Sequence, residues 1–104
     1  MTKVVFYEKD EKLRGFLIKD HSGYDDAGYD IVCASVSSAA YLTANTLTEI
    51  VGAKADIEVR EAYFRFILRD KFVEAEDHLK GLKLHLESLA GDYSEYISCK
   101  TETV

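Results

Sequence analysis

The sequence predicts an α+β fold of two layers, in which two helices cover one face of a mostly antiparallel sheet in the order β-β-α-β-β-α-β. Three observations predict it. Short segments show the two-residue alternation of strands, two longer segments show the helical period, and the chain contains no proline that would mark irregular linkers. With 104 residues, 47% of them hydrophobic, the chain is long enough to bury a core, so we expect a single domain over residues 1–104.

The first two strands are expected at residues 3–7 and 12–18, joined by a polar turn at residues 8–11. Along the first strand the side chains alternate between two faces, as a half-buried strand requires. The second strand contains a continuous apolar run at residues 16–18, which predicts a central strand covered on both faces.

The first helix is expected over residues 31–51, where apolar side chains recur at helical spacing. Asp30 is a suitable N-cap, because its carboxylate can accept a hydrogen bond from a first-turn amide, and Gly52 is a suitable stop. Small residues would let this helix lie close against the sheet, and they are Ala34, Ser35, Ser37, Ser38, Ala39, Ala40 and Ala44.

The second half of the chain repeats the pattern of the first. Two strands are expected at residues 57–59 and 64–68, followed by an amphipathic helix over residues 72–89 that ends at Gly91. A last short strand is expected at residues 96–99. The two β-β-α halves suggest an internal repeat.

The net charge, the apolar runs and the cysteines limit which kinds of protein and partner are expected. The net charge of −6 disfavours direct binding to nucleic acid, because contacts to phosphates need a basic surface, and it would instead attract a basic polypeptide. No apolar run approaches the roughly 20 residues of a membrane span, and the first residues lack a signal-peptide core, so we expect a cytoplasmic protein without a membrane partner. Cys33 and Cys99 form no C-x-x-C pair and are expected to be free thiols.

The most informative segment is the loop at residues 20–30, which separates His21 from Cys33. If Asp30 caps the helix, Cys33 is its third residue, where the helix dipole favours a thiolate by only about 0.3–1 kcal/mol. A protonated His21 close to the sulfur would add the charged partner that a reactive thiolate needs. This layout is expected of a cysteine nucleophile with a histidine base, and helix amides or loop glycine amides could then form an oxyanion hole.

Several residues near this pair are candidates for supporting roles. Ser37 lies one helical turn after Cys33, where its hydroxyl could reach the thiol or the imidazole, or could simply allow close packing. The carboxylates that could orient the imidazole are Asp20, Asp25, Asp26 and Asp30. The loop residues that could contact a bound peptide are Gly23, Tyr24, Gly28 and Tyr29.

Other interpretations remain open at this point. A cysteine in a helix is often a small buried hydrophobe, and a histidine beside a loop is often an ordinary surface residue. Zinc binding fits poorly, because His21 and Cys33 offer one ligand at each end of a 12-residue gap, so no metal or other cofactor is expected. Cys99 is expected to pack against the sheet, and His78 and His85 to lie on a solvated face of the second helix.

The stretch from His21 to Ser37, with the run Asp-Ile-Val-Cys-Ala at residues 30–34, resembles the ribosomal-processing cysteine proteases of the Prp family. Members carry a histidine, a loop rich in glycine and aspartate, the same five-residue run and a serine one turn later. The order of elements agrees over the whole chain. One departure is visible, because members commonly have Gly-His-Ala where this chain has Asp20-His21-Ser22.

The resemblance implies an endopeptidase that removes a short N-terminal extension from the bacterial large-subunit ribosomal protein L twenty-seven, and it implies a homodimer. It implies that His21 is the general base and Cys33 the nucleophile, with Asp30 and Ser37 as supporting residues. Two other functions stay open. One is a non-catalytic ribosome-assembly factor that binds a basic peptide in the same groove, and the other is a thiol redox sensor, which would lack a resolving cysteine near Cys33.

Overall fold

The computed structural model describes residues 1–26 and 29–104 and has the expected order of elements. All the strands and helices predicted from the sequence are present, with ends that differ by a few residues. Their bounds are β1 (Thr2–Lys9), β2 (Lys12–Lys19), α1 (Ile31–Asn45), β3 (Ala55–Arg60), β4 (Tyr63–Leu68), α2 (Phe72–Asp92) and β5 (Ile97–Thr103). A π-helical turn, η1 (Thr46–Ile50), continues α1, and Gly52 follows it with a left-handed φ of 77° that ends the helical segment.

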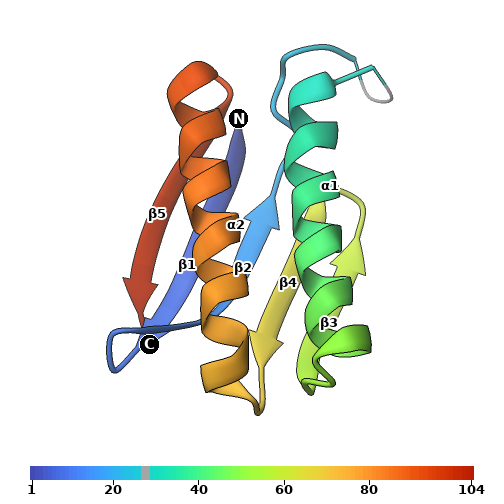
Figure 1. The fold of residues 1–104 in the computed structure, drawn as a ribbon. Coiled ribbons are helices and arrows are strands. Elements are labelled where there is room, and N and C mark those ends of the chain that lie inside the picture. The colour runs from blue at the N-terminus through green and yellow to red at the C-terminus, as the bar shows by residue number, and fades with distance from the viewer. Residues whose placement is uncertain (27–28) are drawn as a thin grey trace.

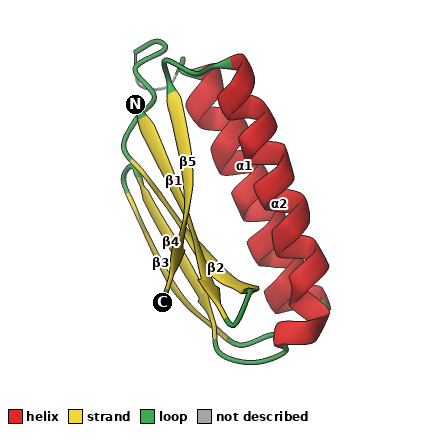
Figure 2. Cartoon of the chain, turned by 90° about the vertical axis from the view of Figure 1, so that its left-hand side faces the viewer, coloured by secondary structure: helices red, strands yellow, loops and turns green. Residues whose placement is uncertain are grey.

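The five strands form one sheet in the order β3-β4-β2-β1-β5. Every neighbouring pair is antiparallel except β1 and β5, which are parallel. Both helices lie on the same face of this sheet, side by side and roughly along the strands (Figure 1). The view along the sheet shows two layers, with both helices on one side and, among residues 1–26 and 29–104, no element on the other (Figure 2). The predicted α+β architecture is therefore confirmed.

The expectation that the second strand is covered on both faces is wrong. β2 is the third of five strands, as a central strand should be, but the helices cover only one of its faces. Leu17 is half-buried and lines a shallow hollow on the open face together with Val5 and Tyr7. An apolar run in a strand thus indicates a central position here, and does not require a second covering layer.

Aromatic side chains form the centre of the core between the sheet and the helices. Phe6, Phe16 and Phe66 are fully buried, and the rings of Phe16 and Phe66 stack with centroids 5.4 Å apart. The helices complete this core with aliphatic side chains that are also buried, among them Val32, Val36, Ala40 and Leu47 from the first helical segment and Leu79, Leu82 and Leu86 from α2. Burial of these side chains fixes the position of both helices on the sheet.

The small residues of α1 lie in two different places. Ala40 and Ala44 are buried against the sheet, as predicted for close helix packing. Ala34, Ser35 and Ser38 are exposed and line a hollow between α1 and α2, so the prediction is wrong for them. The sheet-facing stripe is set by Val32, Val36, Ala40 and Ala44, which recur at four-residue spacing.

Gly15 gives a test of how tightly the strands approach each other. It lies in β2 opposite Ile67 of β4, and a Cβ atom at this position would collide with the backbone carbonyl of Phe66. We expect Gly15→Ala to lower the free energy of unfolding by about 1–3 kcal/mol, because backbone atoms cannot move aside without disturbing the sheet. Urea denaturation followed by circular dichroism measures this change.

Gly91→Ala is the matched control for that measurement. A methyl group at Gly91, near the end of α2, meets no neighbouring atom within 4 Å. Alanine is the better helix former, so the control is expected to keep or slightly raise the stability, by up to about 1 kcal/mol. Equal stabilities of the two variants would contradict the close approach at Gly15.

Candidate active site

Asp30 organises the start of α1. It has an extended backbone conformation, and its Oδ1 atom accepts a hydrogen bond from the Cys33 amide at 2.9 Å, so the predicted N-cap is confirmed. Its other carboxylate oxygen accepts a hydrogen bond from the Ser22 hydroxyl, and Ser22 in turn accepts one from the Tyr24 amide at 3.1 Å. Asp30 and Ser22 are both buried. One carboxylate therefore joins the two ends of the loop to the first turn of the helix.

The hydrogen bonds to Asp30 keep its carboxyl group ionised. Burial alone would raise the pKa of Asp30, but the bonds from the Cys33 amide and the Ser22 hydroxyl favour the charged form and hold the pKa below its ordinary value. Backbone amides of Val32 and Tyr24 contribute in the same direction. The site therefore contains a fixed negative charge at neutral pH, three residues before the cysteine.

His21 and Cys33 line one small cleft of about 150 Å³. The cleft lies where the end of β2, the start of α1 and the β3–β4 turn meet. Ser37 also lines it, one turn after Cys33 as expected. In the described part of the chain no hydrogen bond joins the imidazole to the thiol. The remaining lining residues are Ile18, Lys19, Asp20, Tyr41, Val59, Arg60, Ala62, Tyr63 and Phe64.

Sequence reasoning missed two walls of this cleft. Tyr41 follows Cys33 and Ser37 at four-residue spacing, so it shares their face of α1, and this spacing was a signal that could have identified it. Its ring lies 4.8 Å from that of Phe64, between centroids. The other wall runs from Val59 to Phe64 on the β3–β4 hairpin. It comes from a distant part of the sequence, so no sequence pattern near the His21–Cys33 loop could have identified it.

The backbone at the end of β2 holds His21 beside that hairpin. The Asp20 amide donates to the carbonyl of Ala62 at 2.9 Å, and the Thr2 hydroxyl donates to the carbonyl of Asp20 at 3.0 Å. Asp20 has a left-handed φ of 70°, a conformation that glycine adopts without strain and that aspartate tolerates better than most residues. The departure from Gly-His-Ala therefore falls at a position where the backbone itself favours glycine.

The carboxylate that pairs with His21 is Glu61, which was not among the predicted candidates. The Nε2 atom of His21 lies 3.9 Å from Oε1 of Glu61 in the β3–β4 turn, and both side chains are largely exposed. Asp20 instead pairs with Lys3 at 3.6 Å, and Asp30 is occupied by the donors described above. For Asp25 and Asp26, a bond from the amide of Asp26 to the carboxylate of Asp25 is present within the loop.

The loop is anchored through Tyr24. Its ring packs edge-on against Tyr93 and Tyr96, with centroids 5.8 and 5.2 Å apart, at the junction of α2 and β5. Tyr24 is therefore not among the residues that line the cleft in this conformation.

The other predicted loop contacts lie at the surface or beyond the described residues. Gly23 is exposed and has a left-handed φ of 80°, and Tyr29 is 76% exposed. Neither of them lines the cleft. Gly28 lies outside the described residues.

Cys99 has the structural role that was expected of it. It packs against the core from β5, and its Sγ atom lies 3.6 Å from the carbonyl oxygen of Leu86, to which it donates. Burial, with a smaller contribution from the charge of Glu87, raises the pKa of Cys99 to about 11. A raised pKa keeps this thiol protonated at neutral pH and lowers its reactivity.

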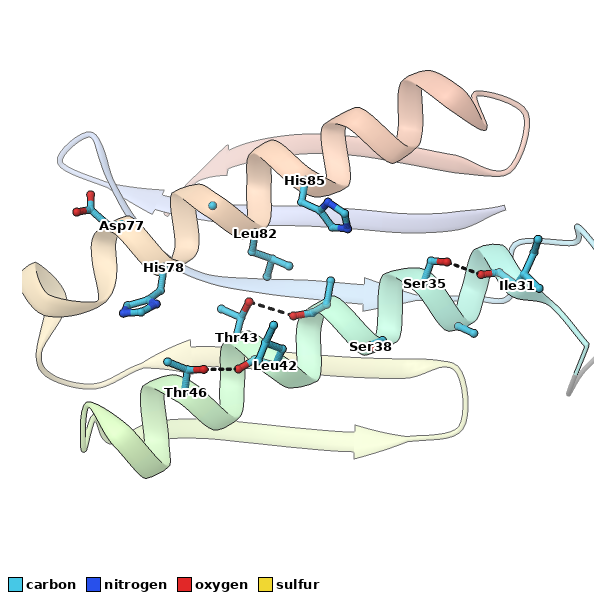
Figure 3. Close-up of a pocket in the computed structure, with 13 residues that line it drawn as sticks. Ile31, Ser35, Ser38, Leu42, Thr43, Thr46, Asp77, His78, Leu82 and His85 are labelled. Carbon is cyan, nitrogen blue, oxygen red and sulfur yellow. Dashed lines mark hydrogen bonds between the residues drawn. The ribbon is translucent and has the colours of Figure 1, made fainter.

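A larger hollow of about 1040 Å³ lies elsewhere, between α1 and α2 on the outer side of the helical layer (Figure 3). Ser35, Ser38 and Leu42 line one side of it, and His78 and His85 line the other. Both histidines are exposed, as predicted. This groove contains neither Cys33 nor His21, so its size does not make it the reaction site.

The described residues include no group of three or more histidine, cysteine, aspartate or glutamate side chains placed to hold a metal ion. Neither helix is both long enough and apolar enough to cross a membrane.

The carboxylate of Asp30 gives a prediction about acid stability. Its folded-state pKa lies below the unfolded value of about 3.9, so its contribution to stability is complete above that pH and is lost as the pH falls through the folded-state value. We expect Asp30→Asn to be less stable than wild type near pH 6, and the difference to shrink below about pH 4.

Urea denaturation between pH 2.5 and pH 7 measures this difference. Ser22→Ala removes one donor to the carboxylate and should show a smaller effect with the same pH trend. A difference between wild type and Asp30→Asn that stays constant over the whole range would contradict a depressed pKa.

Comparisons with known proteins agree with the fold and the family. The crystal structure of the ribosomal processing protease Prp from Staphylococcus aureus, with a covalently linked product peptide, superimposes with a TM-score of 0.91 at 24% identity, covering 98% of this chain and 100% of that one. A structure of the S. aureus protease with a substrate peptide gives a TM-score of 0.86 at 23% identity, with the same coverages.

A Streptococcus mutans protein matches with a TM-score of 0.86 at 21% identity, covering 100% of this chain and 96% of that one. No curated protein matches the sequence. The model of the family "Cysteine protease Prp" matches residues 1–98, which is nearly the whole chain. The chain therefore belongs to the Prp family of cysteine proteases.

Proposed function

We propose that this chain is a single-domain cysteine endopeptidase in which Cys33 is the nucleophile and His21 the general base. The observation that carries the proposal is that these two residues line the same cleft, where the first turn of α1 meets the end of β2. Membership of a cysteine protease family supports the same roles. Asp30 and Ser37 act as supporting residues, the first by capping the helix and the second from the wall of the cleft.

The reaction proceeds through a thioester. His21 takes the proton of the Cys33 thiol, and the thiolate attacks the carbonyl carbon of the scissile peptide bond. The imidazolium then protonates the leaving amine, and His21 activates a water molecule that hydrolyses the thioester. Because the imidazole and thiol are not hydrogen-bonded to each other in the described chain, peptide binding has to bring them together before the first step.

The oxyanion of the tetrahedral intermediate needs donors other than the amides of Cys33 and Ala34. The Cys33 amide donates to the carboxylate of Asp30, and the Ala34 amide donates to the carbonyl of Asp30 at 3.0 Å. These bonds occupy two of the helix amides that the sequence made candidates for an oxyanion hole. The loop amides remain candidates.

We propose that the substrate is the N-terminal extension of the large-subunit ribosomal protein L twenty-seven, cleaved in the cytoplasm. The S. aureus protein with the same fold is a ribosomal processing protease that has been crystallised with peptides. The net charge of −6 supports this choice, because ribosomal proteins are basic and an acidic enzyme attracts them.

Cleavage of a synthetic peptide that spans this extension tests the proposal. Wild type is expected to cleave it, and Cys33→Ala to lose at least about a thousandfold in kcat/KM, because the nucleophile is absent. His21→Ala is expected to lose about a hundredfold or more, because proton transfer is lost. Mass spectrometry of the products measures both effects.

Cys99→Ala is the matched control, since it removes the other thiol of the chain and should keep full activity. Binding of the peptide by wild type without any turnover would favour the alternative of a non-catalytic assembly factor. Equal cleavage by wild type and Cys33→Ala would end the proposal.

We further propose that the enzyme is a homodimer that associates through the groove between α1 and α2. α1 has no charged residue over Ile31–Asn45, although half of it faces solvent. Ile31 is 56% exposed and Leu42 is 70% exposed on this face, with Ser38 between them. An exposed helix normally carries charges on its outer face, so the uncharged α1 side of the groove lowers the repulsion between two acidic chains there, while the α2 side carries Asp77.

A charge in the middle of this face is expected to separate the two copies. Ser38→Arg should lower the mass measured by light scattering from twice the chain mass to the single-chain mass of 11.7 kDa. Ser98→Arg is the control, because Ser98 is exposed on the open side of the sheet and lies outside the groove. A wild type that is monomeric at 100 μM, or a Ser38→Arg variant that stays dimeric, would contradict this interface.

A further inference from the structure

One edge of the sheet leads directly into the cleft. β3 is the outermost strand on its side, and among the described residues it pairs only with β4. Val59 and Arg60 of this strand line the cleft together with Cys33 and His21. The opposite edge strand, β5, contributes no residue to the cleft. Only one of the two edges is therefore continuous with the candidate active site.

The hydrogen-bonding pattern shows which backbone groups of β3 face outward. The Arg69 amide donates to the carbonyl of Lys54, which marks these two residues as a hydrogen-bonded pair of the antiparallel ladder. Such pairs alternate along the ladder, so the inward-facing residues of β3 are those at positions 56, 58 and 60. The amide and carbonyl groups of Ala55, Ile57 and Val59 consequently point away from β4.

This edge lacks several of the features that usually block strand addition. Natural edge strands are often protected by proline, by lysine, by a bulge or by extreme shortness. β3 is six residues long, contains neither proline nor lysine, and pairs with β4 in an unbroken register. Its three charged side chains, Asp56, Glu58 and Arg60, are all engaged in ion pairs within the protein. Ile57 is 46% exposed and Val59 is 50% exposed, on the side of the sheet that α1 only partly covers.

We infer that the polypeptide substrate docks as an added strand on the free edge of β3, with its main chain hydrogen-bonded to Ile57 and Val59. This rests on the proposed protease function, because the edge is assigned to the substrate through its continuity with the cleft. Main-chain pairing would hold an extended peptide in a fixed register, and the strand would deliver one of its bonds to the thiol of Cys33.

Backbone modification of the peptide tests this docking mode without altering the protein. Fluorescence anisotropy measures the Kd of the synthetic extension peptide for the Cys33→Ala protein, with single amides of the peptide replaced by N-methyl amides. The Kd is expected to rise about three- to tenfold at alternate residues and to change little at the residues between them, because only alternate N–H groups face β3.

A variant of the edge itself gives the second test. Ile57→Pro removes one outward-facing N–H group and leaves the bonds to β4 in place, since proline is tolerated at such edge positions. It should raise the Kd about three- to tenfold relative to Ile57→Val, which keeps the N–H group and a β-branched side chain. If Ile57→Pro does not fold, the N-methyl series decides the question.

Several outcomes would overturn the inference. A Kd that is unaffected by N-methylation, or affected without a two-residue period, would show that the peptide does not pair as a strand, and so would absence of any binding. An Ile57→Pro variant that binds peptide normally but changes its oligomeric state would make this edge a contact between copies. Failure of wild type to cleave would instead count against the proposed function, since the binding series needs no turnover.

Discussion

The carboxylate of Asp30 is the interaction on which the geometry of the site depends. It receives the Ser22 hydroxyl on one oxygen and the Cys33 amide on the other. Ser22 follows His21 directly in the chain, so the same group fixes the backbone beside the imidazole and the backbone of the cysteine. Hydrogen bonds to an ionised carboxylate are stronger than hydrogen bonds to a neutral acceptor. Several such bonds stabilise the charged form of Asp30, which explains why its charge is tolerated at a buried position.

Ser22 also gives physical meaning to the departure from the family pattern. The family pattern that the sequence resembles has alanine at this position, which has no hydroxyl to donate to the N-cap. In this chain the added hydroxyl strengthens the link between the two ends of the loop, while Asp20 takes a left-handed conformation that glycine would adopt more easily. The two changes flank His21 and act in opposite directions, one adding a hydrogen bond and the other adding backbone strain.

The fold could be predicted from the sequence because its elements are set by local periodicity. The alternation in β1, the helical spacing in α1 and α2, and the cap at Asp30 are all features of contiguous residues. The juxtaposition of His21 and Cys33 followed from one short loop. What could not be predicted depends on contacts between distant segments. Glu61 reaches His21 from the β3–β4 turn, and Tyr24 packs on residues about seventy positions away. The helices cover only one face of β2, and this likewise depends on where both helices pack on the sheet.

The burial of Cys99 has a practical consequence for anyone designing a covalent ligand. Its sulfur is half-buried and donates to a helix carbonyl, and its pKa is raised to about 11, so it is a poor target for an electrophile. A warhead directed at the cleft is therefore expected to modify Cys33 in preference to Cys99. The stoichiometry of such labelling would count intact sites directly, without a substrate.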